Sequence, residues 1–511
     1  MNYLLRPRAS MEGRTTMNLE NIPEEESLDP ADWQLMRGLG HRMIDDIMTY
    51  LETVRTRPVW QPIPEKIKAY FKQPLPVEPQ GTEQTYQDFL EYVLPHPMGN
   101  IHPRFWGWVI GTGTPLGMLA EMLAAGMNPN VGGADHVANY VEAQVLDWCK
   151  EMLGYPAEAS GLLVSGGSMA NLVGLTVARN SKAEFDLRTH GVHAAPRKMT
   201  LYGSQETHSS VQKAIELLGL GSNAFRQIPV NSDFKIDISG LETAILEDRQ
   251  EGYQPICIIG NAGTVNTGAI DDLDRLADIC QREGLWFHVD GAFGALAVLS
   301  SELRPLLVGM ERADSLAFDL HKWMYMPYEV GCALVRQEDD HRSTFSLTPD
   351  YLTHSDRGLA GGSIWFSDYG VQLSRGFRAL KVWMSMKEHG AQKYGRLIQQ
   401  NIDQARYLAS QVEDMSELQL LAPVPLNIVC FRFVADDLDD ESLNDLNKEL
   451  LIALQESGVA APSYTVIDGK YALRVAITNH RSKREDFEIL VREVIRLGRK
   501  LTHSGQPRRL L

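Results

Sequence analysis

The chain has 511 residues, and 49 Lys and Arg against 66 Asp and Glu give a formal net charge of −17. At roughly 150 residues per domain, this length predicts about three structural units and a large core, which excludes a small stapled or metal-dependent fold. A strongly acidic protein is repelled by nucleic acid and by anionic lipid surfaces, so neither is expected as a partner. An apolar content of 44% argues against a largely disordered chain.

Cysteine usage points to a reducing compartment. The five cysteines are scattered and contain no CxxC pair, which argues against a zinc site or a dithiol redox motif, so no metal is expected. We therefore expect a cytoplasmic protein.

The uncharged stretch 105–120 is rich in Gly, Thr and Pro, whereas a membrane helix needs about 20 strongly apolar residues. This stretch is expected to be a buried, glycine-rich segment close to a ligand.

The N-terminal part is predicted to be a polar tail, residues 1–26, followed by a helical arm, residues 27–105. Apolar residues of the arm recur at three- and four-residue steps, which leaves one apolar stripe that needs a partner surface. These residues are Trp33, Met36, Leu39, Met43, Ile47 and Leu51.

Residues 106–395 alternate short β-rich runs with amphipathic helical runs, which is typical of an α/β fold with a mostly parallel central sheet flanked by helices. Residues 396–511 offer helix, strand, helix, strand and a final helix, enough for a small C-terminal α+β domain. In such sheets ligands bind beyond the carboxyl ends of the strands, so polar residues at those ends are candidate site residues.

Two of these strand ends carry the strongest candidates. SGGSMAN (165–171) lies between an apolar run and a helical run, so backbone N–H groups and the Ser168 hydroxyl could hold a phosphate, although such turns are more often plain structure. HVDGAFG (288–294) places Asp290 after an apolar strand, where a helix cap or a satisfied buried carboxylate is the simpler interpretation.

DLHKW (319–323) places His321 and Lys322 after another apolar strand. A lone His-Lys pair is usually solvated surface, but the apolar flanks here predict a setting in which the Lys322 amine loses its proton more easily. A pyridine aldehyde cofactor needs a lysine for a Schiff base, an acid at the ring nitrogen and a phosphate cup. Lys322, Asp290 and the Ser168 turn would supply the three.

THSS (207–210), HVDGAFG, DLHKW and TPDYLTH (348–354), in that order, resemble the group II pyridoxal-phosphate-dependent decarboxylases, a family acting on aromatic amino acids, histidine, glutamate and cysteine sulfinate. The resemblance runs from the helical arm to the last helix and implies a fold-type I enzyme with pyridoxal 5′-phosphate. It implies that Lys322 binds the cofactor aldehyde, Asp290 pairs with the pyridinium nitrogen and His208 stacks on the ring.

The same resemblance assigns four more positions. Gly167, Ser168 and His321 match phosphate-side residues, and Thr264 in NAGTVNTG falls in a segment that lies near the cofactor in the family. Tyr351 lies in a long polar stretch that looks like a lid, where an ordinary exposed loop tyrosine is the alternative. In the family this tyrosine assists protonation of the carbanion carbon, and related aldehyde synthases carry Phe there, so Tyr351 favours simple decarboxylation.

The substrate remains open between branches of the family. TPDYLTH and Trp108, in the pocket-wall segment, favour an aromatic L-amino acid. Gly132 and Gly133, which stand where aromatic-specific members tend to have bulkier side chains, keep an acidic substrate as an alternative, with Arg474 as the one compelling cationic anchor.

Many members of the decarboxylase family have Asn at the position of Asp319, so the role of this residue is left open.

The expected reaction is decarboxylation to the amine and CO2. Aldehyde synthesis or transamination on the same scaffold, or a cofactor-free binding protein, are the rivals. The family also implies a homodimer that exchanges the N-terminal arm.

Overall fold

The computed structural model describes residues 26–347 and 357–503, which fall into two compact units divided between Tyr50 and Leu51. The first unit contains most of helix α1 (Trp33–Glu52), which forms where the apolar stripe predicted it. The N-terminal part of the second unit contains three helices: α2 (Glu65–Tyr70), α3 (Thr82–Asp88) and α4 (Pro115–Met127). No helix of residues 26–347 and 357–503 is long and apolar enough to cross a membrane.

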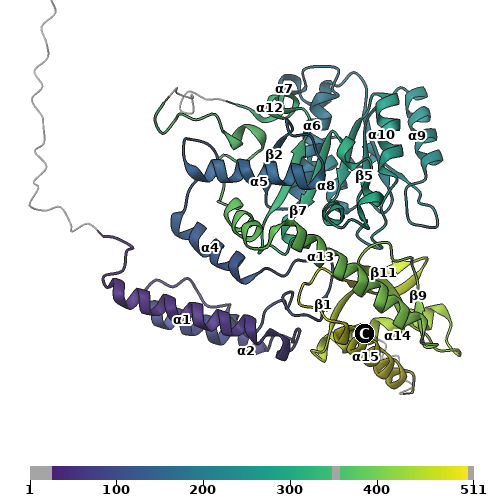
Figure 1. Ribbon diagram of the computed structural model, residues 1–511. Coiled ribbons are helices and arrows are strands. Elements are labelled where there is room, and N and C mark those ends of the chain that lie inside the picture. Colours follow the sequence, from purple (N-terminus) through teal and green to yellow (C-terminus); the bar gives the residue numbers. More distant parts are fainter. Residues whose placement is uncertain (1–25, 348–356, 504–511) are drawn as a thin grey trace, which may run out of the picture. The chain divides into compact units, whose positions relative to one another are not determined.

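A seven-stranded sheet forms the centre of the second unit, in the order β2-β8-β7-β6-β5-β3-β4 (Figure 1). Only β8 runs against its neighbours, so the prediction of a mostly parallel sheet is confirmed. The strands are β2 (Ser160–Val164), β3 (Met199–Ser204), β4 (Phe225–Ile228), β5 (Gln254–Asn261), β6 (Trp286–Asp290), β7 (Ser315–Asp319) and β8 (Gly331–Val335).

Helices cover both faces of this sheet because its central strands alternate apolar residues to both sides. Cys257 and Ile259 of β5 pack with helices α6 and α8, whereas Ile258 packs with α9 and α10. One of these helices, α10, ends at Gly284, which adopts the left-handed conformation. The helices are α5 (Val137–Leu153), α6 (Gly167–Ser181), α7 (Leu187–His190), α8 (Ser209–Leu217), α9 (Ile238–Gln250), α10 (Leu273–Glu283), α11 (Leu320–Trp323) and α12 (Glu338–Phe345).

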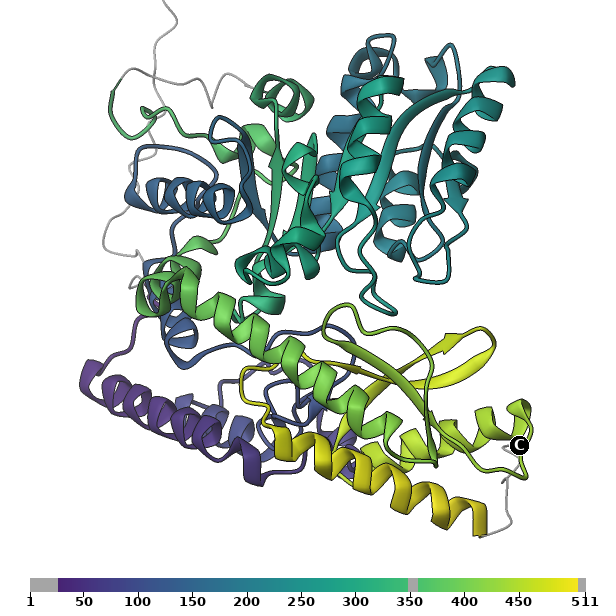
Figure 2. The same ribbon diagram turned by 45° about the vertical axis from the view of Figure 1, so that its right-hand side comes forward.

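A second, five-stranded sheet has the order β1-β11-β12-β10-β9 and carries its own apolar core. The long helix α13 packs against α4 and α5 near its start and against α15 and β9 further on, so it runs from the large sheet to the small one (Figure 2). The elements are β1 (Phe105–Trp106), β9 (Leu418–Leu420), β10 (Ile428–Phe433), β11 (Ala461–Ile467), β12 (Lys470–Ala476), α13 (Ala379–Glu413), α14 (Asp440–Glu456) and α15 (Arg484–His503).

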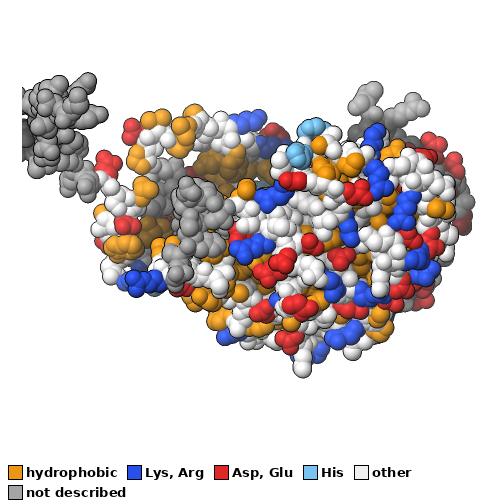
Figure 3. All heavy atoms as spheres, turned by 90° about the horizontal axis from the view of Figure 1, so that it is seen from above, with side chains coloured by type: hydrophobic (Ala, Val, Ile, Leu, Met, Phe, Trp, Pro, Cys, Tyr) orange, Lys and Arg blue, Asp and Glu red, His pale blue; other side chains and the backbone are white. Residues whose placement is uncertain are grey.

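The first small-sheet strand comes from residues far away in the sequence. β1 pairs with β11 in parallel, with Phe105 opposite Ala461, so the segment that follows β1 is tied to the C-terminal part of the chain. On the face drawn in Figure 3, acidic and basic side chains are interspersed.

Candidate active site

The predicted site residues that the structure describes gather at one edge of the large sheet. Strands β2, β3, β5, β6 and β7 all run in one direction, because β8 is antiparallel to both β2 and β7. Their carboxyl ends therefore share an edge, and the polar residues that follow them become neighbours.

The turn from β2 into α6 forms the floor of this edge. Gly167 is buried and Ser168 is exposed at the first turn of α6, where backbone N–H groups have no helical acceptor. A Cβ on Gly167 would lie 2.9 Å from Asp319 Oδ2, and one on Gly166 would lie 3.2 Å from the His321 ring. The two glycines thus let the turn approach the end of β7 closely.

Asp290 ends strand β6 and is 5% exposed. Its Oδ1 accepts the Ala292 N–H at 3.1 Å, and its Oδ2 accepts from the Asn171 side-chain amide at 2.9 Å. Asn171 also donates to Ser210 Oγ at 3.1 Å and lies 2.9 Å from His288 Nε2 through its Oδ1. The carboxylate is therefore held from two sides.

Sequence reasoning quoted Asn171 and His288 within motifs but gave neither a role. A signal was present, because Asn171 lies on the buried face of α6 with Gly167, Ala170 and Gly174 and is the polar residue among them. Gly174 also makes room for its partner, since a Cβ there would lie 2.8 Å from the His288 ring.

His208 is the N-cap residue of α8, and its Nδ1 accepts the Ser210 N–H at 3.2 Å. Its ring is exposed, yet the surrounding protein displaces enough water to lower the His208 pKa. The Asp290 charge opposes this shift and the Lys322 charge adds to it. These three groups from β6, α8 and α11 therefore lie within electrostatic reach of each other.

Lys322 lies on the short helix α11, directly after β7, with its side chain 22% exposed. Its Nζ pairs with Asp319 Oδ2 at 3.1 Å, so the role left open for Asp319 includes this contact. His321 Nε2 lies 3.8 Å from the same oxygen, and burial lowers the His321 pKa. Asp319 Oδ1 is buried without a hydrogen-bond partner.

The remaining two predicted residues differ in what can be said of them. Thr264 follows β5 and is 2% exposed, and its Oγ1 accepts the Ala269 N–H and lies 3.1 Å from Thr267 Oγ1. It therefore holds a tight turn at the same sheet edge. Tyr351 lies outside the described residues.

The segment 108–113 passes directly over Lys322. A Cβ on Gly111 would lie 2.7 Å from the His321 carbonyl carbon and 3.0 Å from the Lys322 carbonyl oxygen. The turn between β12 and α15 holds this segment in place, because Thr478 Oγ1 donates to the Ile110 carbonyl at 2.8 Å and Arg481 donates to the Gly113 carbonyl at 3.3 Å. Apart from Trp108, which is 58% exposed, the segment is largely buried, as the sequence predicted.

Packing explains the small residues at 132 and 133. A Cβ on Gly133 would lie 2.6 Å from Trp365 Cζ3, and one on Gly132 would lie 3.3 Å from the Leu373 carbonyl carbon. The indole of Trp365 thus occupies the space that a side chain at 133 would take. The two glycines therefore do not favour an acidic substrate.

Arg474 is 3% exposed, and its guanidinium donates to the carbonyls of Trp108, Val265 and Asn266. Burial lowers the Arg474 pKa to about 10. Its donors tie the small sheet to two segments at the site, which leaves little capacity to anchor a substrate carboxylate.

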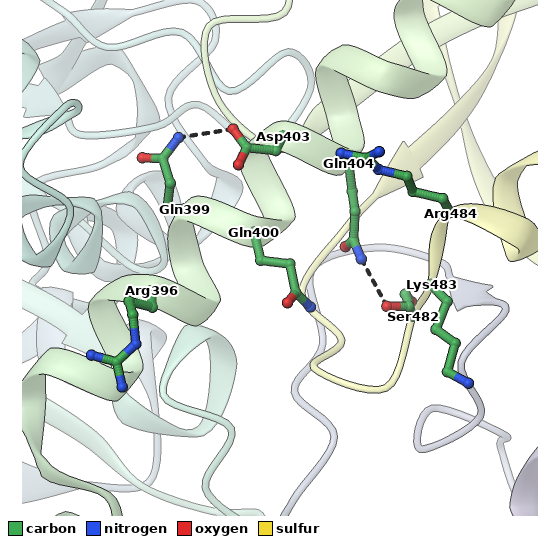
Figure 4. A pocket seen from close by; sticks show the side chains of 8 residues that line it. All are labelled: Arg396, Gln399, Gln400, Asp403, Gln404, Ser482, Lys483 and Arg484. Atoms are coloured by element: carbon green, nitrogen blue, oxygen red, sulfur yellow. Dashed lines mark hydrogen bonds between the residues drawn. The ribbon is translucent and has the colours of Figure 1, made fainter.

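A separate hollow lies between α13 and the turn before α15 (Figure 4). It has a volume of about 470 Å³ and contains none of the predicted site residues. Its lining is Arg396, Gln399, Gln400, Asp403, Gln404, Ser482, Lys483 and Arg484. Two amide groups of this lining already have partners in the protein: Gln399 donates to Asp403, and Gln404 donates to the Ser482 carbonyl.

The chemistry of the donor set fits pyridoxal phosphate. Backbone N–H groups at the first turn of α6 suit a phosphate, the amine of Lys322 suits an aldehyde, and the carboxylate of Asp290 suits a pyridinium nitrogen. Within the described ranges, no cluster of three His, Cys, Asp or Glu side chains is arranged to bind a metal ion.

Known proteins are similar to this chain in sequence and in fold. Residues 64–434 match the model of the pyridoxal-dependent decarboxylase conserved domain. The chain is 35% identical to an aromatic-L-amino-acid decarboxylase of Bacillus atrophaeus, covering 92% of this chain and 96% of that protein. A phenylacetaldehyde synthase of Arabidopsis thaliana is 29% identical, over 91% of this chain and 97% of its own.

Among solved structures, an Oryza sativa protein described as TDC with pyridoxal phosphate and tryptamine superposes with a TM-score of 0.86 at 25% identity, covering 93% of this chain and 100% of that chain. The match of family model, fold and full-length relatives agrees with the resemblance seen in the motifs. The chain belongs to the pyridoxal-dependent decarboxylase family, as an amino acid decarboxylase that uses pyridoxal 5′-phosphate.

Proposed function

We propose that this protein decarboxylates an aromatic L-amino acid to the corresponding amine and CO2. The observation that carries the proposal is the convergence of Lys322, Asp290 and the first turn of α6 at one sheet edge. Substrate class is supported by the aromatic-L-amino-acid decarboxylase of Bacillus atrophaeus at 35% identity. The commitment of Arg474 to three backbone carbonyls weighs against an acidic substrate, which needs a free cation.

Each residue has a role that follows from its position. When bound, the cofactor supplies an electron sink for the electron pair left at Cα as CO2 departs. Gly167, Ser168 and His321 hold the phosphate side, and Thr264 shapes the turn at the same edge. Asp290 keeps a proton on the ring nitrogen. The His208 ring packs on the face of the cofactor.

Lys322 has two tasks in this proposal. Its amine would hold the cofactor aldehyde, and the carboxylate of Asp319, 3.1 Å from Nζ, would pair with this group whenever it is free and protonated. Tyr351 delivers a proton to Cα, a role that rests on the family resemblance. Because Tyr351 stands where aldehyde synthases carry Phe, simple decarboxylation is favoured over aldehyde formation.

The test is a panel of the twenty common amino acids, read out by CO2 release, with amine, aldehyde and peroxide measured from the same incubations. We expect an aromatic amino acid to be the best substrate and the amine to be the main product. Lys322→Ala should abolish the reaction, and Tyr351→Phe should raise the aldehyde share. Purified protein without a visible cofactor band, or an active Lys322→Ala variant, would refute the proposal.

We also propose a cytoplasmic homodimer in which the helical arm, residues 27–105, packs on the partner, while residues 106–395 and 396–511 form the cofactor domain and the small domain. Exposed apolar side chains on α4 and at the start of α5 support a subunit interface there. They are Met122, Leu123, Met127, Val137 and Tyr140. Light scattering tests the dimer, and a fully active monomer would contradict it.

A further inference from the structure

A single chain of hydrogen bonds runs from Trp286 to Asp290 behind the candidate site. Trp286 Nε1 donates to Ser315 Oγ at 2.8 Å, and Ser315 Oγ lies 2.8 Å from His288 Nδ1. His288 Nε2 lies 2.9 Å from Asn171 Oδ1, and Asn171 Nδ2 lies 2.9 Å from Asp290 Oδ2. The interior members of this chain are buried.

The carboxylate end of the chain fixes the direction of its bonds. An ionised carboxylate can only accept, so Asn171 turns its Nδ2 to Asp290 and its Oδ1 to His288. The imidazole must therefore carry a proton on Nε2 and donate to Asn171, and the Nδ1 of a neutral ring accepts from the Ser315 hydroxyl. Burial lowers the His288 pKa to about 4, which keeps this ring neutral and so consistent with one donor and one acceptor.

Asn171 also connects this chain of hydrogen bonds to His208, through Ser210. Its second amide proton goes to Ser210 Oγ, at 3.1 Å, and Ser210 Oγ in turn lies 2.8 Å from His208 Nδ1. The Ser210 N–H reaches the same ring nitrogen at 3.2 Å. His208 Nδ1 thus accepts two bonds, and the proton of the neutral ring is placed on Nε2.

We propose that Asn171 and Ser210 are positioning residues that orient Asp290 and His208 together through one amide group. This inference rests on the proposed roles of Asp290 at the ring nitrogen and His208 on the ring face. One side chain thereby sets both the carboxylate that meets the edge of the cofactor ring and the imidazole that meets its face. An aspartate at 171 would keep the shape and lose both donors, leaving two carboxylates in contact.

The test measures cofactor binding without substrate, so it does not depend on which reaction the enzyme performs. Pyridoxal phosphate is titrated into cofactor-free protein, and the dissociation constant and the circular dichroism of the visible band are recorded. We expect Asn171→Asp to weaken binding by at least about tenfold, because a buried donor is lost and a repulsion is added. Ser210→Ala should alter the dichroic band with a smaller loss of affinity, because only the His208 branch is cut.

Asn447→Asp is the matched control. Asn447 is fully buried in the small domain, and its amide holds the Phe433 backbone with bonds of 2.8 Å, far from the cofactor edge in the fold. This variant should lose stability while the cofactor affinity and the dichroic band stay at wild-type values.

Wild-type affinity and dichroism in both Asn171→Asp and Ser210→Ala would overturn the proposal, as would an equal loss of affinity in Asn447→Asp. If Asn171→Asp does not fold, the dichroic band of Ser210→Ala decides the question alone. A wild-type protein that binds no cofactor would instead refute the proposed function.

Discussion

A methyl group at Gly111 tests whether segment 108–113 fixes the position of Lys322. The new Cβ would overlap the His321 carbonyl oxygen and lie 2.7 Å from its carbon, whereas carbon atoms pack best at about 3.5–4.0 Å, so the two segments must separate by more than about 1 Å. Neither side moves easily. The side chain of Asn100 donates a hydrogen bond to the Gly111 carbonyl at 2.9 Å, and Thr478 donates one to the Ile110 carbonyl. On the other side, the backbone N–H of His321 donates to the Val330 carbonyl, and its ring accepts from the Val330 N–H.

The expected result for Gly111→Ala is a loss in kcat of about 100-fold, equivalent to about 2.7 kcal/mol, because a 1 Å misplacement of a reacting group can cost this much. The free energy of unfolding should fall by about 1–3 kcal/mol through overpacking. CO2 release under single-turnover conditions measures the first quantity, and urea unfolding measures the second.

Gly376→Ala provides the control, because a Cβ there meets nothing within 4 Å. It should leave kcat unchanged and alter stability by less than about 0.5 kcal/mol. A Gly111→Ala enzyme with kcat within twofold of wild type would show that segment 108–113 does not fix the lysine, and the reasoning would be wrong.

Three further predictions concern buried groups. Arg375→Met should lower the free energy of unfolding by about 3–5 kcal/mol because it leaves Glu142 as an unpaired buried charge, and adding Glu142→Leu should restore most of it in urea titrations. Burial lowers the His341 pKa to about 4, so this group binds its proton more readily in the unfolded chain, and stability should fall as the pH drops from 6.5 towards 4. Replacement by Gln should reduce the loss between pH 6.5 and pH 5 by about 1.6 kcal/mol, and identical pH slopes for the two proteins would contradict this. Gly133→Ala should cost about 1–3 kcal/mol in thermal unfolding by displacing the Trp365 indole, and Trp365→Leu in the same chain should recover part of it; an additive double variant would exclude this coupling.

Much of the site could be predicted because its chemistry lies at strand ends. Asp290 and Lys322 each follow a short apolar run, and parallel strands bring such positions to one edge whatever the details of packing. The fold class followed from the alternation of strand and helix patterns. The roles of His208 and Tyr351, in contrast, came from the family resemblance and not from spacing.

The parts that could not be predicted depend on contacts across long stretches of chain. Asn171 and His288 are separated by 117 residues, and only the packing of α6 on β6 brings the amide to the imidazole. On sequence alone Gly133 keeps an acidic substrate as an alternative, but Trp365, from a segment more than two hundred residues later, occupies the space that a side chain at 133 would take. A sequence pattern records which residue is small, and the fold determines what occupies the vacated volume.

The bonds from Thr478 and Arg481 to segment 108–113 have a consequence for how the enzyme is made. Segment 108–113, which passes over Lys322, is held by Thr478 and Arg481, more than 360 residues later in the chain. A nascent chain that has already formed the large sheet therefore still lacks the two hydrogen bonds that hold segment 108–113 in place. Cofactor capture in the final geometry should follow synthesis of residues 478–481, so a chain truncated before residue 478 would hold the cofactor loosely even with every catalytic side chain present.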